Sequence, residues 1–232
     1  LGAYTLTMSG KGTFNNTNAL VLNNASSKLL LSNTGTVGSV STSLASLGVD
    51  VDEDSTITSL TVGHTTPVSI ADGKTLSGGV TVTGGSIKLG ETGTLASTVT
   101  MSGGTLDADE TLTHSGALSH TADITIDVAE NKILTYSGTA INVGANTITL
   151  SGGGSLVSGG MTLNDAQSKL LLNSITLDSA STSANNSGVD VDESSTITAL
   201  AVGHTTPVSI ADGKTLSGVV TVTGGSIKLG ET

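Results

Sequence analysis

Apolar and polar residues alternate along most of this chain, with apolar side chains two positions apart. The pattern is clear in VSIADGKTLSG at 68–78, IKLGETGTL at 87–95 and IDVAENKILTYSG at 126–138. Successive side chains of a β-strand point to opposite faces, so this spacing predicts strands, and helical spacing is not sustained anywhere. Asp-Gly, Gly-Gly and Asn-Asn pairs between the apolar runs are turn signals. We therefore expect an all-β protein.

The strand pattern recurs about every 20 residues. Its apolar-x-apolar starts fall at residues 49, 68, 87, 106, 126, 141, 161 and 189, so that seven steps cover 140 residues. Steps of 20 residues that return the same side-chain type to the same place predict a repeat architecture in which each step is one rung.

A second repeat is much longer. Residues 48–92 return as 188–232 with four differences, in which Asp54 becomes Ser194, Ser59 becomes Ala199, Thr61 becomes Ala201 and Gly79 becomes Val219. Residues 1–92 correspond to 141–232, whereas 93–140 occur once. We interpret 1–232 as a single continuous stretch of a longer repeat array, with seven rungs in each 140-residue unit.

Short strands at this spacing could form antiparallel hairpins or the rungs of a parallel solenoid. Stacked rungs place identical positions about 4.8 Å apart, which suits the recurring side-chain types. An antiparallel sandwich usually needs large aromatic residues to fill its core, and this chain has two Tyr, one Phe and no Trp. The pattern therefore favours a right-handed parallel β-solenoid (β-helix) with rungs of about 20 residues.

The alternation also predicts which side chains point inward. Four charged residues, by the same reasoning, are expected to be exposed: Asp50, Lys74, Lys88 and Lys214. The residues predicted to lie in the core are Val68, Ile70, Leu76, Ile87, Leu89, Ile126, Val128, Ile141, Val143, Val189, Val191, Val208 and Ile210.

The charge balance excludes some partners. The formal net charge is −11, there is no clustering of basic residues, and nucleic acid or an anionic bilayer would need such a cluster. No run of 18 or more apolar residues is present, so we expect no membrane-spanning segment. The chain has no cysteine, which fits an exported bacterial protein that stabilises itself by stacking.

Asp50, Asp52 and Asp54 are the one weak candidate for a metal site, because they occupy the first three ligand positions of an EF-hand calcium loop. The expected glycine is Ser55, and the twelfth position is Thr61 instead of a glutamate. The simpler interpretation is that Val49 and Val51 point inward while the carboxylates face water. We expect no cofactor.

Histidines and an enzymatic site were weighed in the same way. His64, His114, His120 and His204 have no second ligand at metal spacing, so we interpret them as solvated turn residues. Catalysis needs an acid, base or nucleophile held in a pocket, and no such set is visible. Polysaccharide-cleaving solenoids would be the analogy, but this chain has no Arg to hold a uronate.

Two other features could belong to a binding surface. Thr-x-Thr recurs at 5–7, 56–58, 81–83, 98–100, 111–113, 147–149, 196–198 and 221–223, at gaps that break a regular register, so ordinary outward-facing threonines are expected. The Ser-rich stretches 33–47 and 173–187 differ most between the copies. They are interpreted as loops, which either tolerate insertions or form a binding face.

These rung patterns, the richness in Thr, Ser, Gly and Asn, and the near-identical long repeat resemble the β-solenoid regions of bacterial surface proteins, such as autotransporter passengers, filamentous adhesins and giant surface fibres. The resemblance covers the whole chain and implies export and a location on the bacterial cell surface. It implies a rigid extracellular fibre or stalk element. The alternative is an adhesin that contacts a receptor, glycan or ice through loops or a Thr-rich face.

Neither end of the sequence shows an atypical polar cap. YTLTMSG begins at residue 4 and IKLGET closes the chain. Because terminal rungs expose unpaired backbone groups, we expect the solenoid to continue in the same chain or to self-associate end to end.

Overall fold

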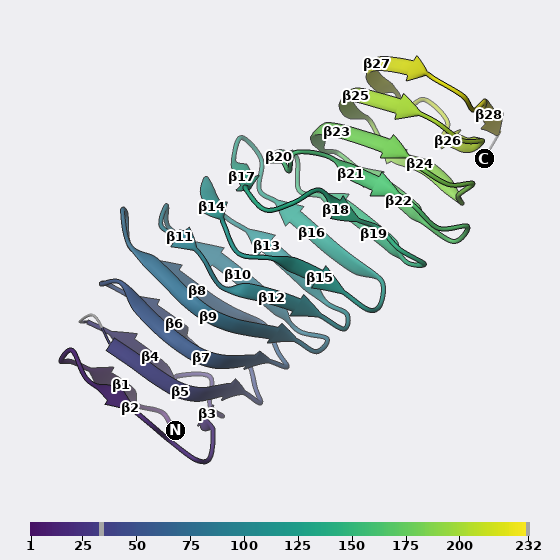
Figure 1. Ribbon diagram of the computed structural model, residues 1–232. Helices are drawn as coiled ribbons and strands as arrows, with labels where there is room; N and C mark the ends of the chain where they lie inside the picture. The colour runs from purple at the N-terminus through teal and green to yellow at the C-terminus, as the bar shows by residue number, and fades with distance from the viewer. Residues whose placement is uncertain (33–34, 231–232) are drawn as a thin grey trace.

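Successive strands of the chain wind into one continuous coil, in which each turn stacks on the one before (Figure 1). The computed structural model describes residues 1–32 and 35–230. Over these residues the chain forms 28 strands and no helix, and each pairing between named strands is parallel. The fold is therefore a β-solenoid of about 11 turns. The right-handed sense of the coil stays a prediction.

One side of the coil is a sheet of twelve strands, sheet 1, to which each turn contributes one strand. In spatial order its strands are β1 (Thr5–Met8), β4 (Lys28–Leu31), β6 (Gly48–Val51), β8 (Thr66–Ile70), β10 (Ser86–Gly90), β13 (Thr105–Ala108), β16 (Ile124–Val128), β19 (Thr147–Ser151), β22 (Lys169–Asn173), β24 (Gly188–Glu193), β26 (Thr206–Ile210) and β28 (Ile227–Gly230).

The return path of each turn lies in a second sheet of sixteen strands, sheet 2. Its strands are β2 (Thr13–Phe14), β3 (Leu20–Leu22), β5 (Gly35–Thr42), β7 (Ser55–Val62), β9 (Thr75–Val82), β11 (Thr94–Leu95), β12 (Thr98–Met101), β14 (Leu112–His114), β15 (Leu118–His120), β17 (Ile133–Tyr136), β18 (Ile141–Asn142), β20 (Ser155–Val157), β21 (Met161–Leu163), β23 (Thr176–Thr182), β25 (Ser195–Val202) and β27 (Leu216–Val222). Some turns cross it in one long strand and others in two short ones.

Sheet 2 bends around a corner in the middle of each turn. In β7 the buried positions Ile57 and Leu60 are three residues apart instead of two, and both residues between them face outward. On β9 the same corner is made by Gly78, whose φ is 115°. A Cβ atom at Gly78 would lie 1.8 Å from the carbonyl oxygen of Ile57, so this corner requires glycine.

The core is a stack of aliphatic side chains enclosed by both sheets. Of the thirteen residues predicted to point inward, twelve are at most 4% exposed. The thirteenth, Ile210, is half-buried and packs against the same core. The predicted inward positions are therefore confirmed.

The prediction that Asp50, Lys74, Lys88 and Lys214 are exposed is wrong in degree, because all four are half-buried. Each forms an ion pair with a neighbouring turn. Asp50 pairs with Lys28, and Lys74 with Glu53 at 2.7 Å. The other two pairs are Lys88 with Asp107 at 3.1 Å and Lys214 with Glu193 at 2.6 Å. These contacts hold the side chains against the sheet surface.

The rungs between residues 126 and 189 differ from the sequence prediction. The strands that begin at Ile141 and Met161 were expected to start rungs like those at 126 and 189, but β18 and β21 belong to sheet 2. The corresponding sheet 1 strands are β19 and β22, and the paired core residues are Ile126, Leu150, Leu172 and Val191. The error arose because INV and MTL repeat the same apolar-x-apolar pattern on both sheets.

The Ser-rich stretches are not loops. Most of 33–47 forms β5, and most of 173–187 forms β23, both in sheet 2. Asn33 and Thr34 lie outside the described residues. Serine and threonine occupy the outward positions of these strands, so the polar composition reflects a solvated sheet face.

The two near-identical copies lie far apart along the coil. In the order of sheet 1, β26 is the seventh strand after β8, which corresponds to about 34 Å at roughly 4.8 Å per strand.

Equivalent residues of the copies nevertheless fall in different rows of sheet 1. Paired positions run from Val68 through Leu89 and Ala108 to Val128. The row of Val208 runs back through Val189, Leu170 and Ile148 to Ile124. Val128 and Ile124 are both in β16, so the second copy is shifted by four residues along the strand. The long turn from Ile126 to Leu150 contributes to this shift.

Candidate functional site

Charged residues are distributed very unevenly between the two sheets. Within the described residues, sheet 2 carries a single charged residue in its strands, Asp178 in β23. The strands of sheet 1 carry ten: Lys28, Asp50, Lys88, Asp107, Asp127, Lys169, Asp190, Asp192, Glu193 and Lys228. A face without charge on a protein with a formal net charge of −11 is the feature that most needs a functional explanation.

The outward positions of sheet 2 hold rows of hydroxyl side chains in register. Four threonines on consecutive turns, in β9, β11, β14 and β17, are direct neighbours, and we call them row 1: Thr75, Thr94, Thr113 and Thr135. On the other side of the corner, β5, β7, β9, β12 and β15 align a second set, row 2: Ser41, Thr61, Thr81, Thr100 and Ser119.

Each row has a partner row two residues further along the strands. Backbone amides of Thr83, Ser102 and Thr121 donate to the preceding turn at 2.9 Å, which continues the ladder beside row 2. Next to row 1, the amides of Ala96, Ser115 and Ser137 do the same at 2.8–3.0 Å. Sheet 2 therefore presents a two-dimensional array, with about 4.8 Å between turns and roughly 6.6 Å between positions two apart.

The hydroxyls of this array are held by the sheet itself. The Ser119 hydroxyl donates to Thr100 Oγ1 at 3.3 Å, one turn away. Thr83 and Ser102 donate to the carbonyl oxygens of Val62 and Val82, at 3.3 and 3.4 Å. A hydroxyl that donates to the protein keeps its oxygen lone pairs as acceptors for the solvent. The array is thus ordered before any ligand arrives.

The sequence analysis missed this register. The prediction that the Thr-x-Thr threonines face outward is confirmed, since none of those described is buried. Their irregular gaps were taken to exclude aligned rows, and that inference is wrong. Turns of different length occur, and Ser-x-Ser, Thr-x-Ser and Ser-x-Thr fill the rungs between Thr-x-Thr, as at Ser41 and Ser119. Counting Ser and Thr as equivalent would have revealed the rows.

The structure does not bring the three candidate calcium ligands together. Asp50 pairs with Lys28 on the preceding turn, and Asp54 accepts the backbone N–H of Thr75 at 2.9 Å on the following turn. Asp52 is exposed in the turn after β6. Val49 and Val51 are buried, as the simpler interpretation predicted. Over residues 1–32 and 35–230, no three His, Asp or Glu side chains are grouped to hold a metal ion.

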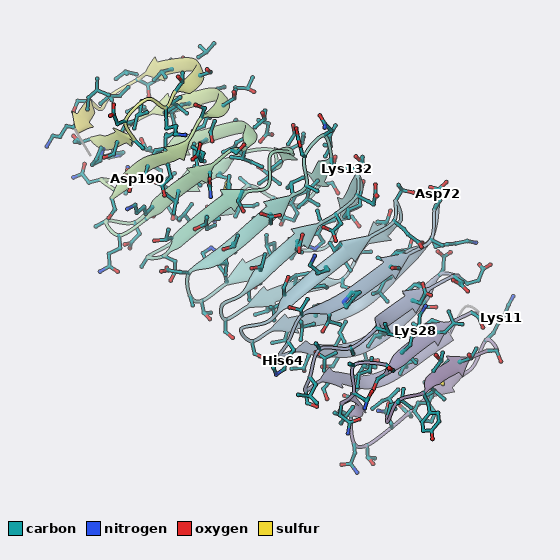
Figure 2. The ribbon with its side chains drawn as sticks, turned by 180° about the vertical axis from the view of Figure 1, so that it is seen from behind. Lys11, Lys28, His64, Asp72, Lys132 and Asp190 are labelled. Atoms are coloured by element: carbon teal, nitrogen blue, oxygen red, sulfur yellow. The ribbon has the colours of Figure 1, made fainter. Side chains whose placement is uncertain are left out.

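The carboxylates gather instead along one long edge of the rod. Figure 2 shows Asp72 and Lys132 on this edge and His64 on the opposite one. Lys132 pairs with Glu110 at 2.5 Å, one turn away. The ammonium of Lys74 has a raised pKa, chiefly because it donates a hydrogen bond to Glu53. Side chains on this edge therefore tie neighbouring turns together.

Asp107 shows what burial does to a charge on sheet 1. Its pKa is raised, because burial disfavours the carboxylate more than the ion pair with Lys88 favours it. The pKa of Lys88 is raised as well, since the hydrogen bond to Asp107 stabilises the ammonium. The two directions conflict for a simple ion pair, and the burial of Asp107 accounts for the difference.

The four histidines do not share one environment. His64 and His204 are exposed, as expected. His114 is wholly buried, so its assignment as a solvated turn residue is wrong. It occupies the inward row that continues from Leu76 and Leu95, and its ring lies 5.3 Å from the ring of Tyr136.

The buried His114 ring is only partly satisfied. Nε2 lies 3.0 Å from the carbonyl oxygen of Ser97, whereas Nδ1 has no hydrogen-bond partner. Burial lowers the pKa of His114, and the Ser97 carbonyl opposes this only in part. The imidazole is therefore neutral in the folded protein at physiological pH.

His120 marks an interruption in sheet 2. β15 pairs with β12 and β18 pairs with β21, but β15 and β18 are not paired with each other. Across this break, His120 Nε2 lies 3.0 Å from the carbonyl oxygen of Asn142, and Nδ1 lies 3.2 Å from that of Ala122. Row 2 ends at this break, so the array spans the turns from β5 to β17.

No family model, no curated protein and no solved structure matches this chain. In the part of the chain that the structure describes, no helix is long and apolar enough to cross a membrane.

Proposed function

We propose that this chain is a structural element of an extracellular bacterial fibre or stalk, and that it works as a rigid rod. The observation that carries the proposal is the continuous sheet 1, in which twelve strands follow one another in parallel register. A solenoid transmits contacts only between neighbouring turns, so its length grows with the number of repeats while its cross-section stays constant.

The ion pairs support the same role. Six lysines contact acids on an adjacent turn, and the second copy repeats the pairs of the first. Lys28 with Asp50 corresponds to Lys169 with Asp190, and Lys74 with Glu53 corresponds to Lys214 with Glu193. Cross-links at the same place in each copy resist shear between turns.

The test is a change of length. Duplicating residues 48–187 within the chain adds seven turns and should lengthen the rod by about 34 Å, measured as the maximum dimension in small-angle X-ray scattering and in electron micrographs. An insertion of equal length made of Gly and Ser is the control, because it adds flexible chain without turns. A duplicated chain that is no longer than the original, or that forms two separate globules, would contradict the proposal.

The cell-surface location is tested separately. Antibodies against the purified rod should label intact cells of the source bacterium without permeabilisation. Labelling that appears only after the cells are opened would contradict an extracellular role.

A further inference from the structure

We propose that the hydroxyl array of sheet 2, over the turns from β5 to β17, binds the surface of ice. This inference goes beyond the rod proposed above, because it assigns a ligand to one face of the molecule. It starts from rows 1 and 2, which place threonine and serine side chains on consecutive turns in strict register.

The first argument is chemical. An ice surface is neutral, with hydrogen-bond donors and acceptors repeated a few ångströms apart. Threonine offers one donor, two acceptor lone pairs and a methyl group, so an array of threonines can hydrogen-bond to lattice water while its methyl groups fill the spaces between. Charged side chains hold water in their own hydration shells, and the strands that carry rows 1 and 2 contain none.

The second argument is geometric. Each hydroxyl contact with water is weak, so adsorption to a crystal requires many contacts at once on a template that does not move. Thr81 and Thr100 are paired neighbours on β9 and β12, and Val80, Val82, Val99 and Met101 behind them are at most 2% exposed. Figure 1 shows these strands lying nearly parallel over one another.

The third argument concerns the alternatives. Sugar recognition uses aromatic rings for stacking and charged or amide side chains for paired hydrogen bonds. The array has no arginine, and the aromatic residue next to it, Tyr136, is buried. An anionic polymer is disfavoured by the formal net charge of −11. Ordered water is the partner that the exposed groups fit best.

The experiment grows an ice front slowly through a solution of the whole chain and measures the fraction of protein taken up by the ice. It also measures grain size during recrystallisation. We expect the protein to be enriched in the ice and to keep the grains small. The double variant Thr81→Lys/Thr100→Lys places two charges in row 2 and should lose both effects. Thr81→Val/Thr100→Val keeps the side-chain shape and removes the hydroxyls, and it should lose part of them.

The matched control is Thr125→Lys/Thr149→Lys. These two threonines are also paired neighbours at outward positions, but they lie on β16 and β19 of sheet 1. This variant should adsorb to ice as the unmodified chain does. Circular dichroism and thermal unfolding establish that all variants are folded.

Three outcomes would overturn the proposal. The first is an unmodified chain that ice excludes as completely as a globular protein of equal charge. The second is a sheet 1 variant that loses as much adsorption as the sheet 2 variant. The third is binding to cellulose particles, or lateral bundling of the rods in sedimentation experiments, without any effect on ice. That result would give the array to another partner.

Discussion

Sheet 1 and sheet 2 enclose the same aliphatic core, but they differ in shape and in what they show to the solvent. Sheet 1 takes one short strand from each turn and carries lysines and acids. Sheet 2 bends at a corner in each turn and carries serine and threonine. The inward positions of both sheets obey one rule of alternation, so the outward positions are free to diverge. The difference indicates that the two faces serve different purposes.

The largest expected effect tests the corner that only sheet 2 has. Gly78→Val should destabilise the protein by more than about 4 kcal/mol, because a Cβ there would overlap the carbonyl oxygen of Ile57, and φ is positive. Gly79→Val is the control, since the second copy has Val219 at this position, exposed to solvent. Urea unfolding followed by circular dichroism measures both. Equal losses in the two variants would contradict the requirement for glycine at the corner.

The next effect tests whether the two sheets share one core. Leu106→Ala in sheet 1 and Leu95→Ala in sheet 2 should each cost about 2–5 kcal/mol, the usual range for truncating a buried leucine. Both side chains are at most 1% exposed. The free energies of unfolding come from denaturant titration. A loss below about 1 kcal/mol in one sheet alone would mean that the core on that side is loosely packed.

A smaller effect depends on pH and is confined to sheet 2. The pKa of His114 is lowered in the folded protein, whereas an unfolded chain has an ordinary histidine pKa of about 6.5. As the pH falls through this value the unfolded state takes up a proton first, so stability is fully present above about pH 6.5 and is lost below it. The loss ends once the pH is below the folded pKa.

His114→Leu is the variant that isolates this effect, because the preceding neighbours in the same row are Leu76 and Leu95. It should raise stability at neutral pH by about 1–2 kcal/mol, since it removes the unpartnered Nδ1 atom. Comparing melting temperatures of both proteins from pH 7.5 to 5 cancels the contribution of the carboxylates. Parallel curves for the two proteins would show that His114 does not titrate in this range.

The smallest effect tests the charges of sheet 1. Lys88→Met should cost less than about 1 kcal/mol, because the side chain is partly exposed and pairs of this kind are screened by water and salt. The loss should shrink in 1 M NaCl. Thr113→Val on sheet 2 should show no such salt dependence in the same melting experiment. A salt effect of equal size in both variants would remove the electrostatic distinction between the faces.

Much of the fold could be predicted because alternation decides which side chains are buried. Val68, Ile87 and Val189 are in the core for the reason that the sequence indicates. The turns between Ile126 and Val191 could not be assigned, since strands of both sheets share one pattern. His114 could not be recognised as a core residue, because only the pairing shows that its row continues from Leu95. The hydroxyl rows emerge only when the turns are superposed.

The near-identity of residues 48–92 and 188–232 has a consequence for inheritance. Both copies receive a chain that arrives from a Lys-Leu-Leu-Leu strand, β4 in one case and β22 in the other. Unequal recombination between the two stretches would delete or add one whole unit, and the new junction would stack a familiar strand on a familiar neighbour. Lineages carrying such a gene can therefore vary the reach of the rod in steps of one unit, without first evolving a new contact between turns.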